Sequence, residues 1–198
     1  RFGAFGAYLF GVHTGRLGFL TDVLLDECAQ FLAELKNGDF YLQKPKFLKA
    51  KLIKGQNFTK KLAFNDITLM REKINSTTQI DFNSYIGDGV ILSSPMGSTA
   101  YNMSAGGAIM HPKCEIFAIT PICSHALTQR PLILPAHFEV EFRSNDDVIV
   151  LIDGQDYVRL KDYDSVKISI SEISINLIRR TGRDYFDVLK QKLRWGHQ

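Results

Sequence analysis

The spacing of hydrophobic residues changes at Gly38, and this change limits the possible folds more than any other feature of the chain. Before Gly38, apolar residues recur every three or four positions between residues 24 and 35, which is the pattern of an amphipathic helix. Gly38 is a typical helix stop, and Thr21 or Asp22 is a suitable cap for the start. After Gly38, apolar and polar residues mostly alternate, which indicates many short strands. The sequence therefore predicts a strand–turn–helix unit of an α/β domain, followed by an antiparallel sandwich or barrel-like sheet.

Short apolar or alternating segments locate the expected strands. Residues 7–12 form a continuous apolar run that predicts a buried parallel strand before the helix. Further strands are expected at residues 47–53, 62–70, 78–82, 90–94, 115–120, 137–142, 148–153, 165–170 and 173–178. A second helix, capped by Asp184, is expected near the C-terminal end of the sequence. Basic residues outnumber acidic ones in residues 176–198, which we interpret as a solvated helix face rather than a phosphate site.

Composition excludes several classes of protein. Among 198 residues, 45% are hydrophobic and 11% aromatic, so the chain can bury a core and is not disordered. The formal net charge of +3 is too small and too diffuse to indicate a nucleic-acid partner. The apolar runs are only as long as strands, so no membrane-spanning helix is expected. Cys28, Cys114 and Cys123 have neither disulfide nor zinc-site spacing, which predicts a soluble protein of the reducing cytoplasm.

The stretch from residue 87 to residue 107 is the most informative candidate for a binding site. A strand leads into a proline–glycine turn, after which Ser98 or Thr99 would cap a short helix. Gly97 and the Gly106–Gly107 pair allow the backbone to approach a ligand closely. Tyr101 offers a stacking face and a hydroxyl group. An ordinary capped turn would have the same composition, so the residues alone leave both interpretations open.

Other candidate residues carry weaker signals. Asn65 and Asp66 place an amide beside a carboxylate, a pair that could read a base edge and a sugar hydroxyl but that is also common at turns. Residues 152–156 first indicate a hairpin turn. His125 is more typical of a structural imidazole than of a catalytic one, and Cys123 has no neighbouring base in the sequence. No Walker-type phosphate loop and no GxGxxG turn after a strand is present.

Taken in order, these segments resemble the NAD kinases. The blocks are GVHTGRLGFLTD at residues 11–22, ND at 65–66, DG followed by PMGSTAYNMSAGG within 88–107, TPI with His125, RPL at 130–132, DGQ at 153–155 and LRWG at 193–196. The resemblance extends over essentially the whole chain.

The resemblance implies a fold and a reaction. The fold would combine the remainder of an N-terminal α/β domain (1–38), a β-sandwich NAD-binding domain (39–175) and a C-terminal segment (176–198) that packs back on the first domain. The reaction would transfer the γ-phosphoryl group of ATP, with Mg²⁺ or another divalent cation, to the 2′-hydroxyl of the adenosine ribose of NAD. Inorganic polyphosphate is an alternative donor. The family's sites are completed by a neighbouring subunit, which implies a homo-oligomer, most commonly a tetramer.

The resemblance also implies which residues bind NAD. Asn65 would contact the adenine and Asp66 a ribose hydroxyl, while Asp88 would lie near the positively charged nicotinamide. The remaining residues implied at the NAD site are Thr99, Ala100, Tyr101, Asn102, Met103, Ser104, Cys123 and Gln155. No residue of the chain is implied as a metal ligand.

Two departures from the family pattern bear on catalysis. The family's GGDGT turn, whose aspartate is its proposed general base, is not in the sequence, so no catalytic residue is assigned; we expect the turn to precede residue 1. The stretch between Asn65 and Asp88 is also short for the family, with a candidate point of missing residues at Asp81–Phe82. Two alternatives therefore stay open: a catalytically silent NAD(P)-binding sensor of the same fold, and a relative of the lipid kinases.

Overall fold

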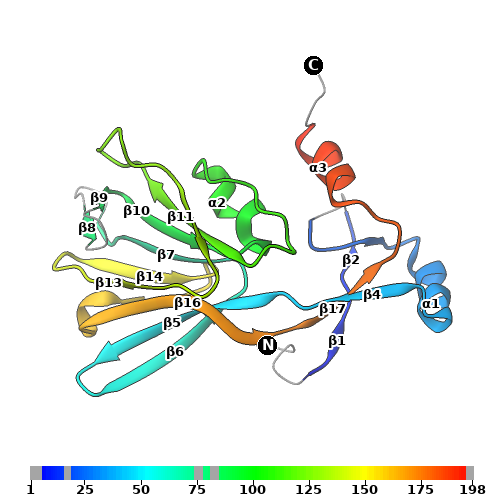
Figure 1. The fold of residues 1–198 in the computed structure, drawn as a ribbon, viewed down its shortest axis with the longest axis horizontal. Helices are drawn as coiled ribbons and strands as arrows, with labels where there is room; N and C mark the ends of the chain where they lie inside the picture. The colour runs from blue at the N-terminus through cyan, green and yellow to red at the C-terminus, as the bar shows by residue number, and fades with distance from the viewer. Residues whose placement is uncertain (1–5, 16–18, 74–77, 81–84, 195–198) are drawn as a thin grey trace. The chain divides into compact units, whose positions relative to one another are not determined.

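The computed structural model describes residues 6–15, 19–73, 78–80 and 85–194. The chain divides into two compact units (Figure 1). The first unit combines residues 1–45 with residues 173–198, and the second unit is residues 46–172. The candidate point of missing residues at Asp81–Phe82 lies outside the described residues. Within the described residues, no helix is long and apolar enough to cross a membrane.

The first unit is a small α/β layer. Its three-stranded sheet has the order β1-β17-β4, with β17 parallel to β1 and antiparallel to β4. A separate parallel pair joins β2 and β3. The elements are β1 (Tyr8–Leu9), β2 (Val12–His13), β3 (Val23–Leu24), α1 (Cys28–Asn37), β4 (Phe40–Gln43), β17 (Asn176–Arg180) and α3 (Tyr185–Leu193).

Two local predictions for this unit were wrong at helix α1 and at residues 7–12. Helix α1 begins after Glu27, because residues 23–24 pair as a strand and Asp22 faces arginines instead of capping a helix. The apolar run at residues 7–12 divides into β1 and β2, and Tyr8 is exposed rather than buried. Two predicted helix ends are confirmed. Gly38 ends α1 with a left-handed φ of 83°, and the Asp184 carboxylate caps α3 by accepting a hydrogen bond from the Phe186 N–H at 3.0 Å.

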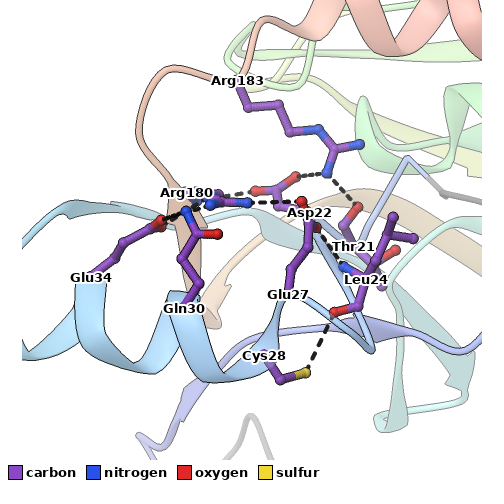
Figure 2. Close-up of polar contacts among 9 residues, drawn as sticks. All are labelled: Thr21, Asp22, Leu24, Glu27, Cys28, Gln30, Glu34, Arg180 and Arg183. Carbon is purple, nitrogen blue, oxygen red and sulfur yellow. Dashed lines mark hydrogen bonds and ion pairs between the residues drawn. The ribbon is translucent and has the colours of Figure 1, made fainter.

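Three arginines at the C-terminal end of this unit bind acidic residues near its start. Arg180 forms a bidentate pair of hydrogen bonds with the Glu34 carboxylate, at 2.8 and 2.6 Å, and its Nη1 lies 3.2 Å from the Glu27 carboxylate (Figure 2). The buried Asp22 carboxylate lies 2.9 Å from Nε of Arg179 and 3.2 Å from Nη1 of Arg183. The expectation of a solvated basic face is therefore wrong for these three arginines, since carboxylates distant in sequence neutralise them.

The second unit is a β-sandwich. One sheet has six strands in the order β12-β11-β10-β7-β14-β15, the other has four in the order β13-β16-β5-β6, and β8 and β9 form a short pair. The elements are β5 (Lys46–Lys54), β6 (Asn57–Ala63), β7 (Asp66–Arg71), β8 (Thr78–Ile80), β9 (Tyr85–Gly87), β10 (Gly89–Ser93), η2 (Met96–Thr99), α2 (Tyr101–Ser104), β11 (Ile116–Ile122), β12 (Leu132–Pro135), β13 (Glu139–Phe142), β14 (Val148–Ile152), β15 (Asp156–Arg159), η3 (Leu160–Asp162) and β16 (Ser165–Ser174).

The core of the sandwich draws on the inner faces of both sheets. Leu48 and Leu52 of β5 and Phe142 of β13 pack in one fully buried cluster with Ile67 and Phe117 of the six-stranded sheet. Residues that alternate along β5 are buried, as the period of two predicts. The predicted combination of a partial α/β layer and a β-sandwich is therefore confirmed.

Strand limits and unit boundaries differ in places from the prediction. The expected strand at residues 62–70 is interrupted at Phe64–Asn65, and β4, β9, β12 and β15 were missed because they are short and do not alternate clearly. The boundaries fall after residues 45 and 172 rather than after residues 38 and 175. Strand β4 accounts for the first difference, because it pairs with β17.

Candidate functional site

Three sequence motifs meet at one end of the six-stranded sheet. Strand β7 runs antiparallel to both β10 and β14, so the start of β7 lies beside the ends of the other two strands. Asp66 is opposite Ser93 in one pairing, and Ile67 is opposite Ile152 in the other. The Asn65–Asp66 pair, the segment that follows β10 and the hairpin that follows β14 are therefore neighbours in space.

The hairpin after β14 holds the Asn65–Asp66 pair through Asp153. The Asp153 carboxylate accepts hydrogen bonds from the backbone N–H groups of Phe64, Asn65 and Asp66 at 2.7, 2.7 and 3.1 Å. The Asp153 N–H in turn donates to the Asp66 carbonyl at 3.0 Å. Asp153 and Gly154 have left-handed φ angles of 51° and 63°, as a type I′ hairpin turn requires. The predicted hairpin at residues 152–156 is thus present, and its first turn residue also organises β7.

The segment after β10 contacts the same pair from another side. The Ser94 N–H donates to the Asn65 carbonyl at 2.9 Å, and the Ser94 hydroxyl donates to the Phe64 carbonyl at 2.7 Å. The Ser94 Oγ also accepts from the Gly97 N–H at 3.0 Å. A Cβ atom at Gly97 would lie 2.0 Å from the Asn65 carbonyl oxygen, so this close approach requires glycine.

Internal hydrogen bonds shape the turn between residues 96 and 107. Neither Ser98 nor Thr99 caps a helix as predicted: η2 follows Pro95, and α2 follows Ala100 without a side-chain cap. The Ser98 hydroxyl is instead buried and bonds to the Pro95 and Met110 carbonyls, at 2.8 and 3.2 Å. Residues 96–107 therefore form a rigid turn that is held by its own hydrogen bonds.

Asn102 lies at the centre of this turn and is fully buried. Its amide nitrogen donates to the Ala108 carbonyl at 3.1 Å, and its amide oxygen accepts from the Thr120 hydroxyl at 2.6 Å. A Cβ atom at Gly107 would lie 2.2 Å from the Asn102 oxygen. Because the protein occupies both ends of the Asn102 amide, this residue shapes the turn, and the neighbouring side chains are the ones left to contact a ligand.

The other predicted residues at this end of the sheet differ in exposure. Tyr101 is 42% exposed, and Ser104 and Gln155 are also exposed. Half-buried side chains complete the group: Asn65, Thr99, Ala100 and Met103. An exposed aromatic ring thus lies on the same rigid loop system as small polar groups.

Asp66 is the buried ionisable group of this site, with 6% of its surface exposed. Burial and, secondarily, the charge of Asp153 raise the pKa of Asp66 above its ordinary value. A hydrogen bond from the Thr68 hydroxyl, at 3.3 Å, opposes that rise. A carboxylate in this position is a strong hydrogen-bond acceptor with little competing water.

Asp88 and Cys123 lie at the opposite end of strand β10. The β10 register pairs Gly89 with Ile122 on one side and with Met70 on the other, which places both predicted residues away from Asp66. The six residue steps from Asp88 to Ser94 span roughly 20 Å at about 3.3 Å per residue. The structure therefore separates the predicted NAD-binding residues into two groups.

The partner of Asp88 could not be predicted from the sequence. Nη2 of Arg71 lies 3.2 Å from the Asp88 carboxylate, and the Arg71 N–H donates to the Asp88 carbonyl at 3.1 Å. Seventeen positions separate the two residues in a non-local strand pairing, so only the register could have identified this ion pair. Beside them, the exposed Cys123 has a left-handed φ of 46°.

No cluster of three or more histidine, cysteine or acidic side chains in the described part of the chain could hold a metal ion. We assign no chemical step to a metal ion held by these residues.

Comparison with known proteins identifies the family. The family model described as the ATP-NAD kinase C-terminal domain matches residues 65–180. The NAD kinase of Sulfurimonas denitrificans is 41% identical over 196 residues, covering 95% of this chain and 69% of the relative. The NAD kinase of Campylobacter jejuni is 42% identical over 197 residues, covering 96% and 68%.

Solved structures agree with this relationship. The yeast NADH kinase complexed with NADH superposes with a TM-score of 0.85 at 26% identity, covering 96% of this chain and 60% of the yeast chain. An Archaeoglobus fulgidus NAD kinase in complex with ATP has the same fold, with a TM-score of 0.74 at 23% identity and coverage of 93% and 73%. The chain thus spans about two thirds of the length of its relatives, and it belongs to the NAD kinase family.

Proposed function

We propose that the protein transfers the γ-phosphoryl group of ATP to the 2′-hydroxyl of the adenosine ribose of NAD, which yields NADP. Membership of the NAD kinase family carries this proposal, since the matched relatives are NAD kinases at about 41–42% identity. The arrangement of the site supports it, because the predicted adenine and ribose contacts occur together at one end of a rigid sheet.

Each predicted residue at this end of the sheet has a place in the proposed complex. Asn65 offers its amide to the adenine edge, and the Asp66 carboxylate accepts a hydrogen bond from a ribose hydroxyl. Tyr101 stacks against the dinucleotide, because its ring is exposed on the segment that follows β10. Thr99, Ala100, Met103 and Ser104 line the adenine site, and Gln155 approaches from the hairpin. The chain's contribution to the rate is then to place the hydroxyl in line with the donor phosphate.

The phosphate chemistry needs groups beyond these residues. We propose that Mg²⁺ enters with ATP as the metal–nucleotide substrate, where it offsets phosphate charge. The general base that the family resemblance implies belongs to the GGDGT turn, which is not in this sequence. Polyphosphate remains the alternative donor, and we place the reaction in the cytoplasm.

The separation of Asp88 from Asp66 supports a shared site. We propose a homo-oligomer, a tetramer by family resemblance, in which Asp88 and Cys123 of one subunit complete the nucleotide site of a neighbour. The residues near Asp66 and the pair Asp88 and Cys123 lie at opposite ends of β10. Each subunit would therefore contribute one part of the site at either end of this strand. Mixing an Asp66→Asn subunit with an Asp88→Asn subunit would then restore part of the lost activity, whereas sites contained within one subunit would give no restoration.

The decisive assay measures NADP formation from NAD, ATP and Mg²⁺ by the full-length protein with a coupled dehydrogenase. Turnover by the wild type and by an Asp26→Asn control, but not by Asp66→Asn, is the expected result, because Asp26 is exposed and outside the site. NAD binding without turnover would favour the sensor, and phosphorylation of a lipid instead of NAD would contradict the proposal.

A further inference from the structure

The tip of the β14–β15 hairpin carries one residue that the binding scheme leaves unused. Asp153 is half-buried, and its two carboxylate oxygens accept three consecutive backbone N–H groups at the start of β7. Oδ2 accepts from Phe64, while Oδ1 accepts from both Asn65 and Asp66. The segment 64–66 is thereby held by a side chain about 90 positions away in the sequence.

We propose that Asp153 is a positioning residue for NAD: it fixes the backbone of residues 64–66 so that the Asn65 amide and the Asp66 carboxylate face the nucleotide together. This inference rests on the proposed function. Ser94 and Gly97 hold the carbonyl side of the same segment, so Asp153 on the N–H side completes a backbone clamp.

The turn itself does not require a carboxylate. A type I′ turn needs left-handed φ at residue 153, which asparagine and glycine adopt as readily as aspartate. Three N–H donors converging on one side chain do require it, because an asparagine would aim its own N–H₂ group at one of them. The choice of aspartate at this position is therefore explained by the clamp and not by the turn.

The clamp also places a second negative charge near Asp66. Asp66 is flanked by Asp153 from the hairpin and by the Thr68 hydroxyl on its own strand, and the segment 94–104 contributes no acidic or basic side chain. The Asp153 charge adds to burial in raising the pKa of Asp66. Removing the charge without removing the side chain would therefore lower the pKa of Asp66, an effect that a purely mechanical role would not produce.

The test compares Asp153→Asn with the matched control Asp156→Asn in the full-length enzyme. Asp156 lies three positions along the same hairpin, is exposed, and forms an ion pair with Lys61 at 2.6 Å. Asp153→Asn is expected to raise KM for NAD on the order of tenfold, as the loss of a charge-assisted hydrogen bond implies, and to leave KM for ATP nearly unchanged. The acid limb of kcat/KM for NAD is expected to move to lower pH. Asp156→Asn should change neither quantity.

A wild-type KM and an unshifted acid limb in a folded Asp153→Asn enzyme would overturn the inference. If that variant does not fold, Gly154→Ala is the second test. The added Cβ meets no atom within 4 Å, so alanine causes no clash. It does strain the turn, because φ is 63° at this position, and it thereby displaces the Asp153 carboxylate while keeping its charge. A raised KM for NAD without a pH shift would then support positioning, and an unchanged KM would reject it. Failure of the wild type itself to make NADP would instead reject the proposed function.

Discussion

The buried carboxylate of Asp22 gives the sharpest test of how the first unit is held together. Its side chain is only 5% exposed and lies between the guanidinium groups of Arg179 and Arg183, which are 10% and 16% exposed. The same two arginines donate to the Leu20 and Thr21 carbonyls at 2.8 and 3.0 Å, so they fasten the loop around Asp22 as well as its charge. Asp22→Asn keeps the shape of the side chain and removes the charge.

The magnitude follows from the burial of the partners. Removing one member of a buried ion pair costs about 3–5 kcal/mol, because the remaining charge stays desolvated without compensation. Burial already lowers the pKa of Arg183, and Asp22 opposes this effect, so the two arginines would lose their counter-charge together. Since both arginines keep some contact with solvent, we expect the lower end, about 3 kcal/mol. For a chain of this length the corresponding loss in Tm is roughly 6–12 °C.

Urea unfolding at pH 7, followed by circular dichroism, measures this loss directly. Asp26→Asn is the control, because Asp26 lies four positions further along the chain, after β3, and is exposed; the free energy of unfolding of this variant should stay within about 0.5 kcal/mol of the wild type. An Asp22→Asn protein less than about 1 kcal/mol below wild type would refute the reasoning, since it would mean that solvent or a local shift compensates both arginines.

Three further predictions concern the sandwich. Gly97→Ala must move backbone, because its Cβ would meet the Asn65 carbonyl oxygen at 2.0 Å; urea unfolding should show a loss of about 1–3 kcal/mol, and KM for NAD should rise. Thr120→Val leaves the buried Asn102 oxygen without its 2.6 Å donor and should cost about 1–3 kcal/mol in the same assay. Asp66→Asn should weaken NAD binding, yet at pH 7 this variant should have a higher Tm than the wild type. The pKa of Asp66 is raised in the folded state, so the folded wild type loses stability as the pH rises above the ordinary value of 3.8. The higher stability of the Asn variant should therefore vanish below that pH.

Local signals in the sequence were sufficient for much of the fold. The change of period at Gly38 depends only on neighbouring residues, and it separated the helix from the strands that follow. The Asp184 cap was predictable for the same reason. The Thr21 or Asp22 cap was not, because arginines about 160 positions away take the Asp22 carboxylate. A local propensity fails where a distant charge competes for the same group.

The sequence by itself determined which residues make up the candidate site, because the motif blocks name them in order: Asn65 and Asp66, the segment 94–104 and Gln155. Only the tertiary structure decided that these residues meet while Asp88 and Cys123 lie roughly 20 Å away along β10. The physical reason is the antiparallel register, which reverses chain direction at each pairing and so brings together residues that no local pattern connects. The same register gave Asp153 its three N–H partners and Asp88 its arginine.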